Sequence, residues 1–333
     1  MTLSRGAMRL ALVLVALALS GCAREPGRAS APTPPEPSAA PTPSGATPVA
    51  PSSAGSAAAS PGQLEGRAYG LSLLNRDRAA AGLSPLVLDD VASAAALRHV
   101  RDLASHGVTA HWGTDGSVPE QRYTEAGGMH LVTENAACYA DAKARSITVD
   151  GPFDRRAIER FQSAFMAERP PSDGHRKNLL GKMHTGVGLA YATSPGSDVV
   201  CVVQELVDDY GTYGALPQAA KEGESIHVTG ELRPPATFGG IGLARAPVGP
   251  PRTAEALLAT GGYTMPDPAI AYFPKGFKTP KPVALDGNKF SLDLPLSGAG
   301  AGPGLYEVQV FARLPGAEPG RLAPVSLRTV LVQ

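Results

Sequence analysis

The spacing of apolar residues predicts three helices in the first two thirds of the chain. From Gln63 to Ala81 the apolar positions recur at helical intervals, with Ala68, Leu71 and Leu74 on one expected face and Gly82 as the stop. The two further helices are predicted from Asp89 or Asp90 onward, with Val91, Ala94, Leu97, Val100 and Leu103 in steps of three, and from Phe153 to Glu168, with Ile158, Phe161 and Phe165 aligned.

Short apolar runs between and after these helices predict strands. They extend from His130 to Cys138, from Gly186 to Ala192 and from Val199 to Val207. Helices that flank a small sheet bury one face of each element, so we predict an α/β sandwich over residues 63–215.

The pattern changes beyond Glu222, where residues alternate in polarity and Gly and Pro clusters punctuate the runs. Alternation with a period of two is typical of half-buried strands. The predicted strands are Ser225 to Leu232, Phe290 to Leu296, Gly304 to Ala312 and Ser326 to Val332. Residues 222–333 are therefore expected to form an all-β, Ig-like sandwich without a catalytic constellation.

The first residues have the composition of an export signal rather than of a folded element. Arg5 and Arg9 precede a short apolar run, and the small residues Ser20 and Gly21 precede Cys22. Such a run is too short to span a bilayer, so we predict a signal peptide over residues 1–21 that is removed.

The sequence Leu19-Ser20-Gly21-Cys22 resembles a bacterial lipobox. That resemblance implies that Cys22 is lipidated and becomes the first mature residue, so that its acyl chains attach the protein to a membrane. Ala23 follows, and by analogy with Gram-negative lipoproteins a residue other than Asp there implies the outer membrane. A plain secretory signal with an unrelated cysteine is the alternative.

Residues 22–62 are predicted to be a disordered tether. Ten prolines lie between Pro26 and Pro61 among Ala, Ser and Thr, with no aromatic residue. Such a segment cannot bury enough apolar surface to offset its ordering entropy, and proline keeps it extended.

Charge excludes one class of partner. The chain has 30 Lys and Arg against 30 Asp and Glu. Nucleic-acid-binding proteins usually have a basic excess that meets phosphates, so no nucleic-acid partner is expected.

Several motifs occur in the order found in one known family. Leu74-Asn75-Arg76-Asp77-Arg78 is followed by Gly82-Leu83-Ser84-Pro85-Leu86, and later segments are His111 with Asp115-Gly116, Glu134-Asn135, Gly174-His175-Arg176, Gly186-Val187-Gly188 and Gln204. This ordered set resembles the CAP superfamily (cysteine-rich secretory proteins, antigen 5 and pathogenesis-related proteins). The resemblance implies a CAP-type α-β-α sandwich. It departs from the family where a tryptophan is usual on the helix before the Gly-His-Arg segment, because Phe165 stands there.

The resemblance also implies a shared cleft. In CAP domains two histidines and acidic residues gather in one hollow, and the motifs map His111, Glu134 and His175 onto that set. Glu168 is the second acid by its spacing from Phe165, and Glu159 is the alternative.

Two imidazoles and one or two carboxylates have two chemical uses. They can hold a zinc-like cation, with His111 and His175 as ligands and water completing the shell. Without a metal, a His–Glu pair can move protons near neutral pH. A hydrogen-bonded cluster that only fixes loops is the third interpretation. No catalytic nucleophile motif is present, so no catalytic residue is assigned.

Cys138 and Cys201 fall on two predicted strands, and export would place them in an oxidising compartment. We predict a disulfide between them; two buried free cysteines are the alternative.

These features predict an envelope-anchored lipoprotein that displays a CAP domain and binds a lipid, a metal or a protein. The alternatives are a metal-assisted hydrolase of envelope peptides or glycans, and a structural spacer.

Overall fold

The computed structural model describes residues 59–315 and 321–333. The predicted signal peptide, the predicted lipidation site at Cys22 and nearly all of the predicted tether lie outside the described residues. At the end of that segment, the first helix already begins at Pro61, with the Ser60 side chain accepting a hydrogen bond from the Gln63 amide. No helix in the described part of the chain is long and apolar enough to span a bilayer.

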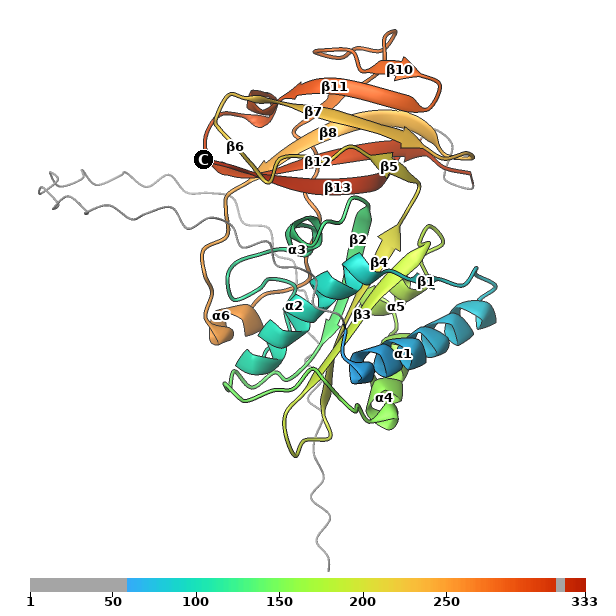
Figure 1. The fold of residues 1–333 in the computed structure, drawn as a ribbon, viewed down its shortest axis with the longest axis vertical. Coiled ribbons are helices and arrows are strands. Elements are labelled where there is room, and N and C mark those ends of the chain that lie inside the picture. The colour runs from blue at the N-terminus through green and yellow to red at the C-terminus, as the bar shows by residue number, and fades with distance from the viewer. Residues whose placement is uncertain (1–58, 316–320) are drawn as a thin grey trace, which may run out of the picture. The chain divides into compact units, whose positions relative to one another are not determined.

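The first half of the described chain is a four-stranded sheet covered by helices (Figure 1). The sheet order is β1-β3-β4-β2, with β1 parallel to β3 and the other pairs antiparallel. The strands are β1 (Val87–Leu88), β2 (Leu131–Ala137), β3 (Gly186–Thr193) and β4 (Val200–Asp208). The helices are α1 (Pro61–Ala80), α2 (Asp90–His106), α3 (Pro119–Glu125), α4 (Arg155–Ala167) and α5 (Gly174–Leu179).

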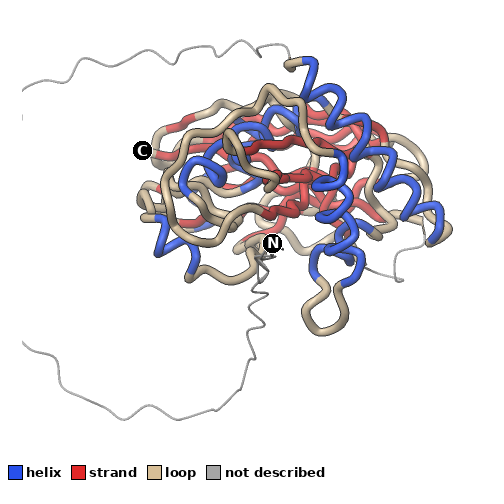
Figure 2. The backbone as a smooth tube through the Cα atoms, turned by 90° about the horizontal axis from the view of Figure 1, so that it is seen from below, coloured by secondary structure: helices blue, strands red, loops and turns tan. Residues whose placement is uncertain are grey.

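Two apolar clusters fix the layers. Ala96, Val100 and Leu103 of α2 pack on one face of the sheet, whereas Leu74 of α1 and Phe165 of α4 pack on the other. Seen from below, the helices lie on either side of the strands (Figure 2). The predicted α/β sandwich is confirmed, and Asp89 caps α2 through its side chain.

The buried face of α1 differs from the predicted one. Ala68 is exposed and Leu71 only partly buried, whereas Leu73, Gly66 and Gly70 face the sheet. A Cβ on Gly70 would lie 1.9 Å from the hydroxyl of Tyr191, so the helix can approach the sheet there only because the residue is glycine. Glycines do not contribute to a pattern of large apolar residues, so the sequence pattern does not identify this buried face of α1.

The second half is a β-sandwich, as predicted. Its first sheet has the order β10-β11-β7-β5 and its second the order β6-β13-β12-β8-β9. The first sheet consists of β5 (Gly211–Tyr213), β7 (Ser225–Leu232), β10 (Ala284–Asp286) and β11 (Lys289–Pro295). The second consists of β6 (Ala219–Ala220), β8 (Thr237–Ala246), β9 (Ile270–Tyr272), β12 (Gly304–Arg313) and β13 (Ala323–Val332). The short helix α6 (Ala254–Leu258) and a 3-10 turn (Leu296–Ala299) complete the elements.

The two halves share a buried junction, because residues of the second sheet that face away from the sandwich core are covered. Glu307 and Gln309 of β12 are 1% exposed. On β13, the Ser326 hydroxyl donates to the Met129 carbonyl at 2.6 Å, and the Thr329 amide donates to the Thr124 hydroxyl at 3.1 Å. The described residues from 59 onward form one compact unit.

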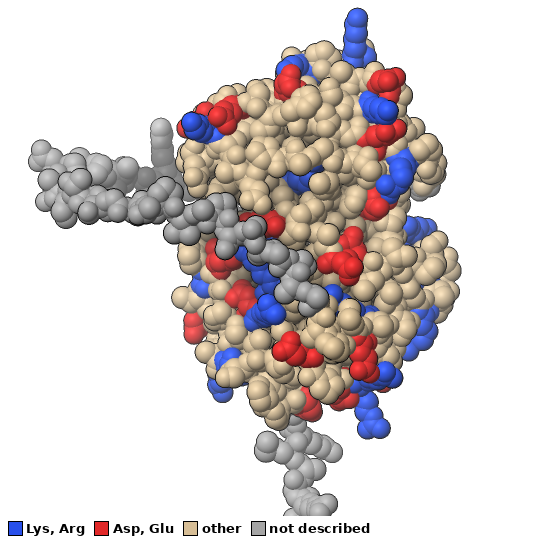
Figure 3. Space-filling view, in the orientation of Figure 1, with Lys and Arg blue, Asp and Glu red and all other residues tan. Residues whose placement is uncertain are grey.

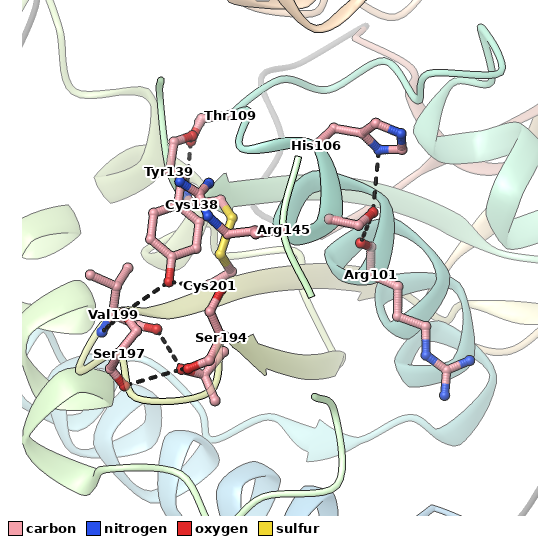
Figure 4. The surroundings of a disulfide bond; sticks show 12 residues. Arg101, His106, Thr109, Cys138, Tyr139, Arg145, Ser194, Ser197, Val199 and Cys201 are labelled. Carbon is pink, nitrogen blue, oxygen red and sulfur yellow. Dashed lines mark hydrogen bonds between the residues drawn. A yellow bond between two sulfur atoms is a disulfide. The ribbon is translucent and has the colours of Figure 1, made fainter. Parts of the chain in front are cut away.

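The predicted disulfide is confirmed. Cys138, directly after β2, is bonded to Cys201 on β4 (Figure 4). Tyr139 beside it donates a hydrogen bond to the Ser197 hydroxyl at 3.0 Å, and the Arg145 guanidinium lies 3.9 Å from the centre of its ring. The covalent link joins the edge strand to the centre of the sheet at this end.

Acidic and basic side chains are interspersed on the face shown in Figure 3. That distribution agrees with the equal numbers of acidic and basic residues in the sequence.

Candidate functional site

Two residues of the predicted set, His111 and Glu134, are in contact at the edge strand β2. Glu134 is buried, and its Oε1 lies 2.9 Å from Nδ1 of His111. Because a carboxylate only accepts, this contact places the proton on Nδ1. Arg122 of α3 donates to Oε2 of Glu134 at 2.7 Å and to the His111 carbonyl at 3.0 Å. One arginine therefore ties both partners together.

The charge on Glu134 is maintained by its neighbours. Burial raises the pKa of Glu134, but His99, Arg122 and His111 outweigh it and hold that pKa well below its usual value. Burial also lowers the pKa of His99 to about 4, so His99 is neutral at physiological pH. Of these three neighbours, the guanidinium of Arg122 is the one whose charge is permanent.

A third histidine, His99 of α2, lies next to Glu134. It is fully buried, with Nε2 2.9 Å from the Ala110 carbonyl and 3.6 Å from Oε1 of Glu134. Its Nδ1 has no hydrogen-bond partner among the described residues.

The other two residues of the predicted set, His175 and Glu168, are also in contact. His175 Nδ1 lies 2.5 Å from Oε1 of Glu168, whose Oε2 accepts from the Arg176 amide at 3.2 Å. The His175 ring stacks on Phe165, with ring centres 4.4 Å apart. Glu159, the alternative acid, contacts the Tyr69 hydroxyl instead.

Neighbouring residues of β2 connect the two pairs. Glu134 contacts His111, and the next residue, Asn135, donates to the His175 carbonyl at 3.2 Å. Asn178 of α5 donates to the Asn135 side chain at 2.9 Å. Both His–carboxylate pairs are thus attached to consecutive positions of the same edge strand.

This part of the chain matches a known family. The model of the cysteine-rich secretory protein (CAP) family matches residues 71–206. The chain contains a CAP domain.

A 1.5 Å crystal structure of an extracellular SCP-domain protein from Bacillus anthracis str. Ames is 21% identical to the chain, with a TM-score of 0.33. The match covers 44% of this chain and 41% of that one, so it spans less than half of the relative's length. No curated protein matches the chain.

Sequence reasoning missed an acid inside the CAP domain. Glu205 of β4 is paired in register with Glu134 and is fully buried. Burial first, and Glu134 second, raise its pKa well above the usual value, and neither of its carboxyl oxygens has a hydrogen-bond partner in the described chain. In the sequence, Glu205 can be recognised as an acidic residue within the apolar run from Val200 to Val207.

Across residues 59–315 and 321–333, no three His, Cys, Asp or Glu side chains are grouped to hold an ion. Nδ1 of His111 and Nδ1 of His175 each contact a carboxylate, which leaves one nitrogen per ring. Zinc binding through His111 and His175 stays a prediction.

Proposed function

We propose that the CAP domain is a ligand-binding module of an exported, envelope-anchored protein, and that the two His–carboxylate pairs contact the ligand together. The observation that carries the proposal is the free Nε2 atom on each ring: neither Nε2 has a hydrogen-bond partner among the described residues. The His111 and His175 side chains are 21% and 32% exposed, so both are accessible to a solute.

The tautomer suggests which ligand groups fit. With the proton held on Nδ1 by a carboxylate, a neutral imidazole offers Nε2 as an acceptor. A ligand that presents hydroxyl or amide N–H donors matches two such acceptors. Headgroups of envelope lipids, glycans and peptides all have donors of this kind.

Binding is favoured over nucleophilic catalysis by the partners of the two rings. Each ring nitrogen that is engaged contacts a carboxylate, and no described Ser, Thr or Cys side chain is hydrogen-bonded to His111 or His175. A nucleophile needs such contact with its base. Hydrolysis by an activated water is the second candidate, because a His–Glu pair is a competent general base.

Co-sedimentation of the Cys22→Ser chain with peptidoglycan sacculi, and separately with phospholipid vesicles, tests the proposal. The cysteine substitution removes attachment through acyl chains. The further double substitution His111→Ala and His175→Ala should weaken binding to one of these targets at least tenfold. His227→Ala is the matched control, because His227 is an exposed histidine of the sandwich that also pairs with a carboxylate.

Equal binding of the double variant and the unsubstituted chain to both targets would contradict the proposal. Release of soluble fragments from sacculi by the chain, lost in the double variant, would favour the hydrolase. The envelope anchor is tested separately by metabolic labelling with an alkynyl fatty acid, which should label the wild type and not Cys22→Ser.

A further inference from the structure

One long connection of the sandwich, residues 247–269, extends onto the CAP domain and is called the excursion below. Strands β8 and β9 are antiparallel neighbours, yet residues 247–269 separate Ala246 from Ile270. Adjacent antiparallel strands need only about 2–5 connecting residues, and a much longer connection usually has a function. In Figure 1 this excursion runs from the sandwich down to α6, beside α2.

Helix α6 anchors the excursion in the CAP core. Leu257 is fully buried in the same cluster as Val100 and Leu103 of α2, and Thr253 caps the helix by accepting from the Ala256 amide. The excursion is therefore fixed at its middle.

On the N-terminal side of α6 the excursion contacts the loop that follows His111. The Arg252 amide donates to the Thr114 carbonyl at 2.8 Å. Gly116 has a φ of +83°, and a Cβ there would lie 2.3 Å from the Gly249 carbonyl oxygen. The two backbones are in direct contact, at a distance that only glycine allows.

Residues from both sides of α6 contact Trp112, the residue next to His111. The Arg252 guanidinium lies 5.3 Å from the centre of the indole, and the Tyr263 ring meets it edge-on at 5.3 Å. The Tyr263 hydroxyl donates to Glu120 in the first turn of α3, the helix that supplies Arg122. Trp112, which follows His111 in the chain, is therefore in contact with the excursion. Arg122, which donates to the His111 carbonyl, is connected to the excursion through Glu120 of the same helix.

We propose that residues 247–269 are a positioning element by which the sandwich fixes His111 on Glu134. This inference rests on the proposed function for its biological meaning, since it concerns the same site. The physical reason is that His111 lies in a loop, and a loop has low local stability unless other groups hold it. The excursion supplies backbone, cation–π and aromatic contacts to residues 112–116, whereas the structure shows no contact of this kind from the excursion to His175 or Glu168.

The test measures the tautomer of each imidazole in the full chain, labelled with 15N-histidine. Nitrogen chemical shifts distinguish a proton on Nδ1 from one on Nε2. Arg252→Ala with Tyr263→Ala removes both side chains from Trp112 and leaves Leu257 as the anchor. Arg155→Ala with Tyr69→Ala is the matched control, because that pair has the same cation–π contact, at 4.9 Å, elsewhere in the CAP domain.

In the wild type both imidazoles should have the proton mainly on Nδ1. In the Arg252/Tyr263 variant the ratio of Nε2–H to Nδ1–H should rise roughly tenfold for His111, the change expected when a hydrogen bond to a charged group is weakened. The signals of His175 and those of the control variant should not change.

An unchanged His111 ratio would overturn the inference. An equal change at His175 would also overturn it, because it would indicate general loosening of the fold. The measurement needs no ligand, so a failed co-sedimentation test of the proposed function leaves its outcome independent.

Discussion

The substitution Glu307→Gln tests the energetics of the junction between the CAP domain and the sandwich. Glu307 is 1% exposed, and its Oε2 has no hydrogen-bond partner among the described residues. Burial first, and the carboxyl of Glu120 second, raise the pKa of Glu307 from its usual 4.5 to about 8. The substitution keeps the shape of the side chain and removes its ability to ionise.

The sign follows from proton binding. Between pH 4.5 and about 8 the folded chain keeps a proton on Glu307 that the unfolded chain has released, so stability falls as pH rises through this window and levels off above it. A tenfold change in proton affinity corresponds to about 1.4 kcal/mol, so a rise from 4.5 to about 8 gives an upper limit of about 5 kcal/mol. Below pH 4.5 this contribution is fully present in the wild type.

Urea unfolding of the full chain at pH 5, 7 and 9, followed by the fluorescence of Trp112, provides the assay. Glu307→Gln should differ little from the wild type at pH 5 and should be more stable by up to about 5 kcal/mol at pH 9. Glu231→Gln, on an exposed position of β7, is the control and should change neither value. A difference between Glu307→Gln and wild type that does not vary with pH would refute the reasoning.

Two further predictions concern the CAP domain. Cys138→Ser with Cys201→Ser should lower the free energy of unfolding by about 4 kcal/mol, because the bond closes a loop with a sequence separation of 63. Reducing agent should lower the thermal midpoint of the wild type but not of the double variant, and two titratable thiols in the unreduced wild type would exclude the bond. Gly188→Ala should lower the free energy of unfolding in urea by about 3 kcal/mol or more, because its Cβ would lie 2.2 Å from the backbone of Ala92. Gly261→Ala is the control and should leave the stability unchanged, because the space around Gly261 is open. Equal stability of the two variants would contradict the packing argument.

The sequence predicts those elements whose pattern is local. Ser225–Leu232 has the predicted bounds because its alternation directly reflects burial of one face. The motif containing Gly188 identifies a strand, and the structure supplies the reason for the glycine, namely the close approach of α2.

Features that depend on distant residues could not be predicted. The helix α3, which supplies Arg122, has seven residues and too few turns to show a period. The pairing of Glu205 with Glu134 depends on strand register, which is set by the whole sheet. The excursion lies among Gly and Pro residues that read as a loop, and only the fold shows that it contacts the CAP domain.

The two His–carboxylate pairs differ in how firmly their carboxylates are held in place. Glu134 is buried, ionised and bonded to Arg122, so rotating it would leave a charge unpaired in the interior, at a cost of several kcal/mol. Glu168 is 21% exposed and follows the last residue of α4, where water can replace a lost contact.

A ligand that contacts both rings would therefore meet one fixed partner and one adjustable partner. We infer that His111 provides the pre-organised contact and that His175 adapts, because ordering costs fall on the less constrained group. The excursion from the sandwich contacts the loop of the fixed partner, His111, through the contact of Arg252 with Trp112.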